Sequence, residues 1–176
     1  MTEGKNFEAQ FKASCEKENI CVLRINDSTM SFGDTENSNF TPKNPCDFVV
    51  FKTPKLFFLE LKSTKNTSFS FQEKIIKANQ IKQLTKFATF EDVNAGFVFN
   101  FRRTNNTYFI DINTFVEFKN CEVDRNPKRK QSINENDCFE IGYLIEQEIK
   151  KVKYHYFVTH FIDWMDKIKK LREVVG

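Results

Sequence analysis

The feature that most constrains the fold is a pair of dense apolar segments joined by a short polar link. Residues 47–51 are DFVVF and residues 56–63 are LFFLELKS. Both are rich in the β-branched and aromatic side chains that favour strands. The link at residues 52–55 is short and contains a proline, so the two segments are predicted to form a β-hairpin. Apolar residues occupy both faces of the second strand, which predicts burial on both sides.

Two charged residues interrupt this apolar hairpin strand. Glu60 and Lys62 are two residues apart and therefore project from the same face of a strand. A Glu-x-Lys tripeptide alone means little, because it recurs elsewhere in the chain. If the turn is centred between residues 53 and 54, however, Asp47 lies directly opposite Glu60. The hairpin then brings two carboxylates and one ammonium group to one patch.

Two opposed carboxylates on neighbouring strands repel each other at a Cβ separation of about 4.5–5.5 Å. A divalent cation would relieve this repulsion, and an all-oxygen site suits Mg²⁺ or Mn²⁺. We expect Asp47, Glu60 and the main-chain carbonyl of Leu61 as ligands, with Lys62 orienting a water or neutralising charge on a phosphate. The alternative is a solvated strand face on which Asp47 pairs with Lys62.

Hydrophobic periodicity divides the rest of the chain into helices, strands and polar connections. Before the hairpin we expect an amphipathic helix over residues 3–17, a strand over residues 20–25 and a long exposed polar loop over residues 26–45. After it we expect an irregular stretch at residues 66–71, a helix carrying Gln80 and a second hairpin turning at residues 102–106. A short helix at residues 113–118 and a basic loop at residues 124–130 should follow. The chain should close with a C-terminal helical tail from about residue 156, with Phe157, Phe161 and Trp164 on its apolar stripe.

Length and composition indicate one α/β domain over residues 1–176, with a mixed central sheet flanked by helices. The net charge of +3 permits phosphate binding without requiring it. Five cysteines without a CxxC pair argue against a disulfide framework or a zinc ribbon and favour a reducing cytoplasm. The chain contains neither a signal peptide nor about 18 consecutive apolar residues, so we expect an intracellular protein with no membrane partner.

A family resemblance rests on several strings. FLELKSTKNTSFSF (residues 58–71) and NQIKQL (residues 79–84) resemble the RecU-type Holliday junction resolvases of the PD-(D/E)xK nuclease superfamily. AGFVFNF, TYFIDINTFVEF and KRKQSI, within residues 95–133, are also similar to that family. The similarity covers most of residues 7–141.

The resemblance implies a restriction-endonuclease-like core and a Mg²⁺-dependent endonuclease for which Mn²⁺ can substitute. Asp47 and Glu60 would be metal ligands, Lys62 the residue that orients water or stabilises charge, and Gln80 a supporting polar residue. Glu8 matches the acidic position of the family's first helix, although it could also form an ordinary surface pair with Lys12.

The expected substrate is branched or duplex DNA, most simply a four-way junction cut by a homodimer, since a two-fold substrate suits a two-fold enzyme. Two alternatives stay open: a restriction-like or phage nicking endonuclease on linear duplex, and a catalytically silent DNA-binding protein. The location would be the cytoplasm, or the host cytoplasm for a phage gene.

Basic residues at three places are candidate DNA contacts. We expect phosphate contacts from the following side chains: Lys65, Arg102, Arg103, Arg125, Lys128, Arg129 and Lys130. Each could equally be a solvated loop residue. Phe69 and Phe71 could stack on an unpaired base, but a core position is favoured in a chain with 21 phenylalanines.

Overall fold

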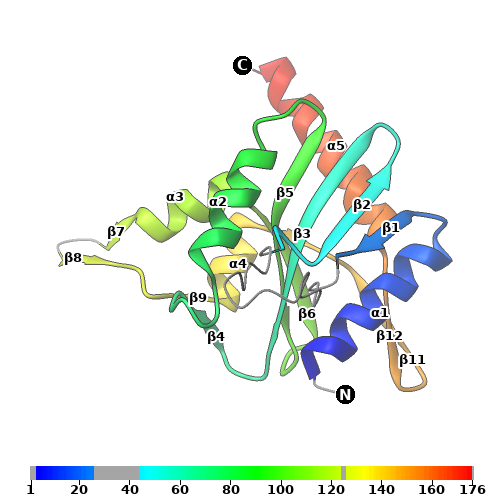
Figure 1. Ribbon diagram of the computed structural model, residues 1–176, viewed down its shortest axis with the longest axis horizontal. Helices are drawn as coiled ribbons and strands as arrows, with labels where there is room; N and C mark the ends of the chain where they lie inside the picture. The colour runs from blue at the N-terminus through cyan, green and yellow to red at the C-terminus, as the bar shows by residue number, and fades with distance from the viewer. Residues whose placement is uncertain (1–2, 26–43, 124–125, 176) are drawn as a thin grey trace, which may run out of the picture.

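The computed structural model describes residues 3–25, 44–123 and 126–175 (Figure 1). Its centre is a mixed six-stranded sheet with the strand order β1-β2-β3-β5-β6-β10. The strands are β1 (Cys21–Arg24), β2 (Phe48–Lys52), β3 (Lys55–Thr64), β5 (Val93–Phe101), β6 (Asn106–Asp111) and β10 (Tyr143–Leu144). Only β3 and β5 pair in parallel, and the other neighbours within this sheet are antiparallel. The sheet confirms the predicted fold class, and both predicted hairpins are present.

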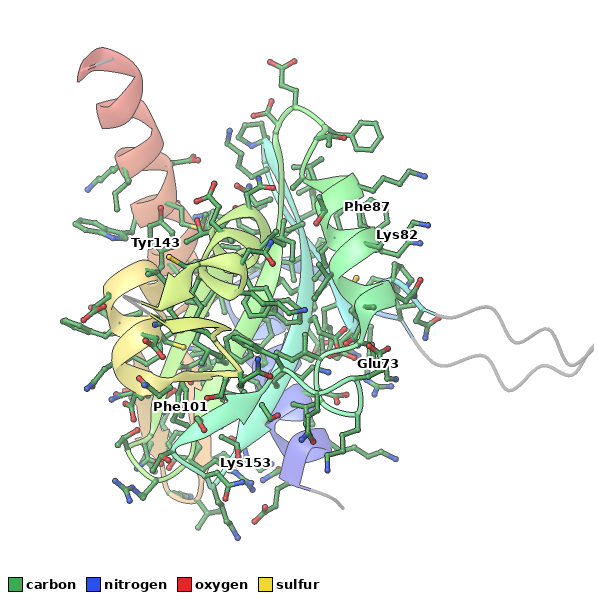
Figure 2. The ribbon with its side chains drawn as sticks, turned by 90° about the vertical axis from the view of Figure 1, so that its left-hand side faces the viewer. Glu73, Lys82, Phe87, Phe101, Tyr143 and Lys153 are labelled. Atoms are coloured by element: carbon green, nitrogen blue, oxygen red, sulfur yellow. The ribbon has the colours of Figure 1, made fainter. Side chains whose placement is uncertain are left out.

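Helices cover both faces of the sheet (Figures 1 and 2). On one face, α1 (Glu3–Lys17) and α5 (Val158–Val175) pack against the sheet in one apolar core, which includes Phe11 and Phe161. On the other face, α2 (Ala78–Phe87), α3 (Ile112–Asn120) and α4 (Glu135–Ile141) contribute to a second core. The sheet is therefore the middle of three layers, and β3 and β5 are buried on both sides.

Strand β3 distributes its side chains between the two cores by simple alternation. Phe57, Leu59 and Leu61 belong to the core beneath α1 and α5. Phe58 points the other way and stacks on Phe87 of α2, with ring centroids 4.0 Å apart. Because Glu60 has the same parity as Phe58, its side chain projects toward the α2 side of the sheet.

The parallel pairing of β3 with β5 requires a crossover, and α2 lies within it. Beyond the crossover, β5 passes very close to β6. A Cβ atom on Gly96 would lie 2.1 Å from the carbonyl oxygen of Ile110. Glycine is thus the residue that permits this strand spacing.

Three two-stranded sheets correct or extend the predictions. Strand β4 (Ser68–Ser70) pairs with β9 (Ser132–Asn134), so residues 66–71 are not wholly irregular. Strand β8 (Asn126–Arg129) pairs with β7 (Glu122–Val123) inside the predicted basic loop. Strands β11 (Gln147–Lys150) and β12 (Lys153–Tyr156) form a hairpin that we did not predict. These short strands are polar or lack regular alternation, so the sequence carries little sign of them.

Side-chain burial decides two further points. Phe69 is 4% exposed and its ring lies 4.7 Å from that of Phe99, which confirms the core interpretation for that residue. The predicted tail helix is α5, but its buried face includes Phe161, Ile162 and Met165, and Trp164 is 56% exposed. The predicted stripe is therefore wrong at Trp164.

Residues 26–43 of the predicted polar loop lie outside the described residues. Among the helices described, none is long and apolar enough to cross a bilayer.

Candidate active site

The hairpin register places Asp47 as predicted. Phe48 pairs with Leu59, so the next position outward brings Asp47 opposite Glu60. The backbone N–H of Asp47 donates to the carbonyl oxygen of Leu59 at 3.1 Å. Its side chain then reaches along β3, where Oδ2 accepts a hydrogen bond from the backbone N–H of Leu61 at 2.8 Å. The Asp47 carboxyl group is therefore fixed by the edge of the neighbouring strand.

Glu60 is buried, with 2% of its surface exposed. Its Oε1 atom accepts hydrogen bonds from Nζ of Lys62 at 2.8 Å and from Nε2 of Gln80 at 2.5 Å. Gln80 is itself oriented, because its Oε1 accepts from the backbone N–H of Lys77 at the start of α2, at 3.2 Å. These contacts rule out the solvated strand face, since Lys62 pairs with a buried Glu60.

Burial raises the pKa of both carboxyl groups, and the two groups also act on each other: the charge of Glu60 raises the pKa of Asp47, whereas a hydrogen bond with Asp47 lowers the pKa of Glu60. Burial, followed by the negative charge of Glu60, raises the pKa of Asp47 to about 7, while the hydrogen bond from Leu61 opposes the shift. Burial also raises the pKa of Glu60, and Lys62 opposes that shift. The positive charge around Asp47 and Glu60 is therefore too small to keep both carboxyl groups fully ionised at neutral pH.

Glu8 of α1 acts on this pair through its charge. Its charge contributes to the raised pKa of Asp47. Its Oε2 atom accepts from Nε and Nη2 of Arg24 at 3.0 and 2.5 Å. The alternative pairing with Lys12 is wrong, because Lys12 pairs with Glu16. Within the described ranges, no three His, Cys or acidic side chains converge as a metal-binding group.

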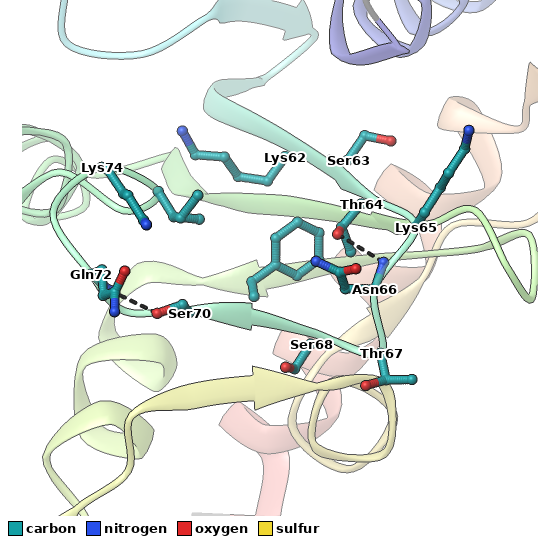
Figure 3. A pocket seen from close by; sticks show the side chains of 12 residues that line it. Lys62, Ser63, Thr64, Lys65, Asn66, Thr67, Ser68, Ser70, Gln72 and Lys74 are labelled. Carbon is teal, nitrogen blue, oxygen red and sulfur yellow. Dashed lines mark hydrogen bonds between the residues drawn. The ribbon is translucent and has the colours of Figure 1, made fainter.

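A polar groove of about 970 Å³ begins at Lys62 and follows the chain to Ile75 (Figure 3). Lys62 and Lys74 lie at one end of the view and Lys65 at the other. Hydroxyl and amide side chains line the space between them: Ser63, Thr64, Asn66, Thr67, Ser68, Ser70 and Gln72. Lys62 thus belongs both to this groove and to the hydrogen bonds around Glu60.

Three of the predicted DNA contacts gather beside this groove. Lys65 and Arg102 both form ion pairs with Glu3 of α1. Arg103 is exposed and lines a neighbouring pocket of about 230 Å³ with Asn66 and Thr67.

Of the other predicted contacts, the structure describes the side chain of Lys130 alone. Lys130 is bound to Asp137 at 2.9 Å and lies 3.9 Å from the ring centroid of Phe118, so its charge is already occupied. Arg125 lies outside the described residues, as do the side chains of Lys128 and Arg129.

Sequence reasoning missed three residues that the structure brings to this region. Lys77 contributes positive charge near Glu60, Lys74 lines the groove, and Glu3 holds Lys65 and Arg102. Lys74 and Lys77 flank the predicted start of the Gln80 helix, which was an available signal. Nothing in the sequence near Glu3 indicates its distant partners.

Comparison with known proteins identifies relatives of this chain. The model of the family described as "RecU: Recombination protein U" matches residues 3–169, well beyond the residues 7–141 that carry the resemblance. The SPbeta prophage-derived uncharacterized protein YotM of Bacillus subtilis (strain 168) is 35% identical over 178 residues, covering 97% of this chain and 90% of YotM.

Among solved structures, the chain is similar to Hjc, a Holliday junction resolvase from Archaeoglobus fulgidus. The TM-score is 0.49 at 18% sequence identity, covering 79% of this chain and 93% of Hjc. The family assignment does not depend on this structural likeness. With the family model matched over nearly the whole chain, and a relative of nearly equal length at 35% identity, this protein belongs to the recombination protein U (RecU) family.

Proposed function

We propose that this protein is a metal-dependent endodeoxyribonuclease that resolves four-way DNA junctions during recombination and repair. One observation carries the proposal: half-buried Asp47 lies opposite buried Glu60, and Lys62, which donates to Glu60, also lines a polar, lysine-bearing groove. A carboxyl group such as Asp47, whose pKa is raised to about 7 by burial and by a neighbouring charge, marks a candidate functional site. Membership of the RecU family supports DNA as the substrate.

The residues present fit a divalent cation. Asp47 and Glu60 offer carboxylate oxygens whose mutual repulsion a cation would relieve. The carbonyl of Leu61 is the third proposed donor. In a strand, the N–H and C=O of one residue point to the same side, and the N–H of Leu61 already points to Asp47. Oxygen donors of this kind favour Mg²⁺, with Mn²⁺ able to substitute. A bound ion would lower the pKa of a water and stabilise charge on the departing oxygen.

The chain's own side chains have distinct proposed roles. Lys62 would neutralise charge on the scissile phosphate and help orient the attacking water, since its ammonium group already lies against Glu60. Gln80 would position Glu60 through its amide. Glu8 would support the site from α1 by its charge. Phosphate contacts are proposed for Lys65, Arg102 and Arg103 beside the groove. The proposal extends to Arg125, Lys128 and Arg129 but not to Lys130, which is paired with Asp137.

Assembly and location form the finer part of the proposal. A homodimer would present two such sites to the two-fold axis of a junction and cut two strands symmetrically. All five cysteines are free thiols. That state suits the reducing cytoplasm, of the host for a phage gene, where recombining DNA is found.

The deciding experiment compares four-way, forked and linear DNA of matched sequence, incubated with Mg²⁺ or Mn²⁺. We expect selective cutting of the four-way substrate by the wild type. Asp47→Asn and Glu60→Gln should reduce cutting by at least about a thousandfold and leave DNA binding within about threefold, since each removes charge stabilisation from the reacting centre. Glu117→Gln is the control, because Glu117 is exposed and belongs to another Glu-x-Lys tripeptide.

Each alternative has its own outcome. Equal cutting of linear duplex would replace the junction resolvase with a restriction-like or nicking endonuclease. Binding with no cutting in either metal would show a silent DNA-binding protein. Full activity in Asp47→Asn or Glu60→Gln would refute the site itself.

A further inference from the structure

We propose that Glu3 occupies the place of a DNA phosphate at the outer end of the groove, and that a bound DNA strand takes Lys65 and Arg102 from it. The inference rests on the proposed function, since it concerns how the same site receives its substrate. The groove, the shared ion pair and the chemistry of Arg102 carry it.

The lining of the groove suits a phosphate chain. It contains lysines and neutral hydrogen-bonding side chains, and no Asp or Glu among the described residues that line it. Lys65 follows Lys62 by three residues of nearly extended chain, a distance of about 10 Å. Because the nucleotide spacing of about 3.4 Å is a rise along the helix axis and phosphates on one strand lie farther apart than that, this span reaches about one or two phosphates along the strand. If Lys62 contacts the scissile phosphate, Lys65 lies beside a phosphate about one or two nucleotides away on the same strand.

Glu3 joins two cations from separate parts of the chain. Lys65 follows β3 and Arg102 follows β5, and both form ion pairs with the carboxylate of Glu3 in the first turn of α1. The two hydrogen bonds lower the pKa of Glu3, so the carboxylate is ionised at neutral pH. A carboxylate held by a lysine and an arginine reproduces the contacts that a phosphate would receive there.

The ion pairs are exposed enough to be exchanged. The side chains of Glu3 and Lys65 are 50% and 71% exposed, and such surface pairs contribute little to stability because water and salt screen them. Arg102 also has an unsatisfied donor, since its Nε is buried without a hydrogen-bond partner in the part of the chain that the structure describes, and a phosphate could use this donor only once the side chain has moved from its contact with Glu3. A phosphate has more acceptor oxygens than a carboxylate and can engage a guanidinium group in bidentate fashion.

Equilibrium binding in EDTA tests the inference without catalysis. A fluorescent four-way junction is titrated with protein at several salt concentrations. Glu3→Gln should bind about two- to fivefold more tightly than the wild type, the range expected when an exposed competing ion pair is removed. Lys65→Gln should bind more weakly, with a salt slope smaller by about 0.9. The matched control is Glu16→Gln, which removes one exposed acid from the far end of the same helix.

Two further measurements separate displacement from a general charge effect or a structural anchor. In a Lys65→Gln/Arg102→Gln background, Glu3→Gln should no longer change affinity. A neutral methylphosphonate placed at single positions on either side of the cut should weaken binding of the wild type when it lies about one or two nucleotides away, but should not weaken binding of Lys65→Gln.

The inference is overturned if Glu3→Gln binds no more tightly than Glu16→Gln, or if its gain persists in the double background. A lower melting temperature in Glu3→Gln without tighter binding would show a structural anchor and would also overturn it. Cleavage of the junction by the wild type is measured in parallel. Intact cleavage with any of these results refutes the role of Glu3 alone, whereas absence of cutting would count against the proposed function.

Discussion

The amide of Gln80 donates to the carboxylate of Glu60 at 2.5 Å, across the crossover that links β3 to β5. Its own oxygen is held by the backbone N–H of Lys77. The amide can therefore present only its N–H groups to Glu60. A residue that begins a helix thus also fixes the orientation of a buried carboxylate.

Replacing Gln80 by alanine should destabilise the protein by about 1–3 kcal/mol, because a buried carboxylate loses a donor and nothing replaces it. Cutting should also require more Mg²⁺, since Glu60 would be less well placed. Urea denaturation and Mg²⁺ titration of cleavage measure the two effects. Gln83→Ala, on the same helix, should change stability by less than about 0.5 kcal/mol. Equal stability of the two variants would contradict the assigned contact.

The raised pKa of Asp47 predicts how stability changes with pH in EDTA. The native state holds this proton with a pKa of about 7, against 3.8 for the ordinary group. The contribution of Asp47 to the free energy of unfolding should therefore fall as pH rises from about 4 to about 7, and stay constant above. Asp47→Asn lacks this titration, so its stability relative to the wild type should increase over that interval. Chemical denaturation at several pH values measures the difference.

If the proposed metal site is correct, addition of Mg²⁺ at pH 8 should reverse this ranking, because an ion bound to the deprotonated pair would stabilise the native state of the wild type by mass action. Asp47→Asn should gain much less. A difference between the two proteins that does not vary with pH would refute the pKa assignment.

Gly96→Ala should lower the free energy of unfolding by about 3 kcal/mol, since the new methyl group meets the backbone of β6 and cannot be relieved by a side-chain rotation. Gly4→Ala is the matched control. A Cβ there meets nothing within 4 Å, and alanine favours the helix by about 1 kcal/mol. Thermal melting should therefore move in opposite directions in the two variants. A Gly96→Ala protein as stable as the wild type would show that β5 and β6 can separate freely.

The adjacent residues Trp164 and Met165 test which face of α5 is buried. Met165 is 5% exposed and lies in the core, so Met165→Ala should cost about 2–5 kcal/mol. Trp164→Ala should cost less than about 1 kcal/mol despite the larger side chain, because Trp164 is mostly exposed. If denaturant melts show a larger loss of stability for Trp164→Ala than for Met165→Ala, the buried face of α5 contains Trp164, as the sequence predicted.

The sequence was sufficient for the parts of the fold that depend on local patterns. The turn between residues 53 and 54 fixes the pairing of β2 with β3, and alternation along β3 then places Glu60 with Lys62. Periodicity likewise located α1, α2 and α3 to within a few residues. The juxtaposition of Asp47 and Glu60 follows from these short-range rules, which is why it was predictable.

Contacts between distant segments were beyond the sequence. The pairing of β4 with β9 joins Phe69 to Ile133, and the ion pairs of Glu3 join α1 to two separate turns. No local pattern specifies such partners. Trp164 shows a different failure, because a helical stripe can be drawn through it although the helix is rotated toward Met165.

The crossover between β3 and β5 also affects when the candidate site can form during synthesis of the chain. All the residues proposed for the metal site and its support lie at or before Gln80 in the sequence, whereas β5 ends only at Phe101. They are therefore synthesised before β5 is complete. Parallel pairing is non-local and forms slowly compared with a hairpin. A nascent chain that has passed Gln80 but not Phe101 therefore carries every one of these groups without the strand that brings α2 over β3. On this topology, the contact between Gln80 and Glu60 is expected to form only once β5 lies beside β3.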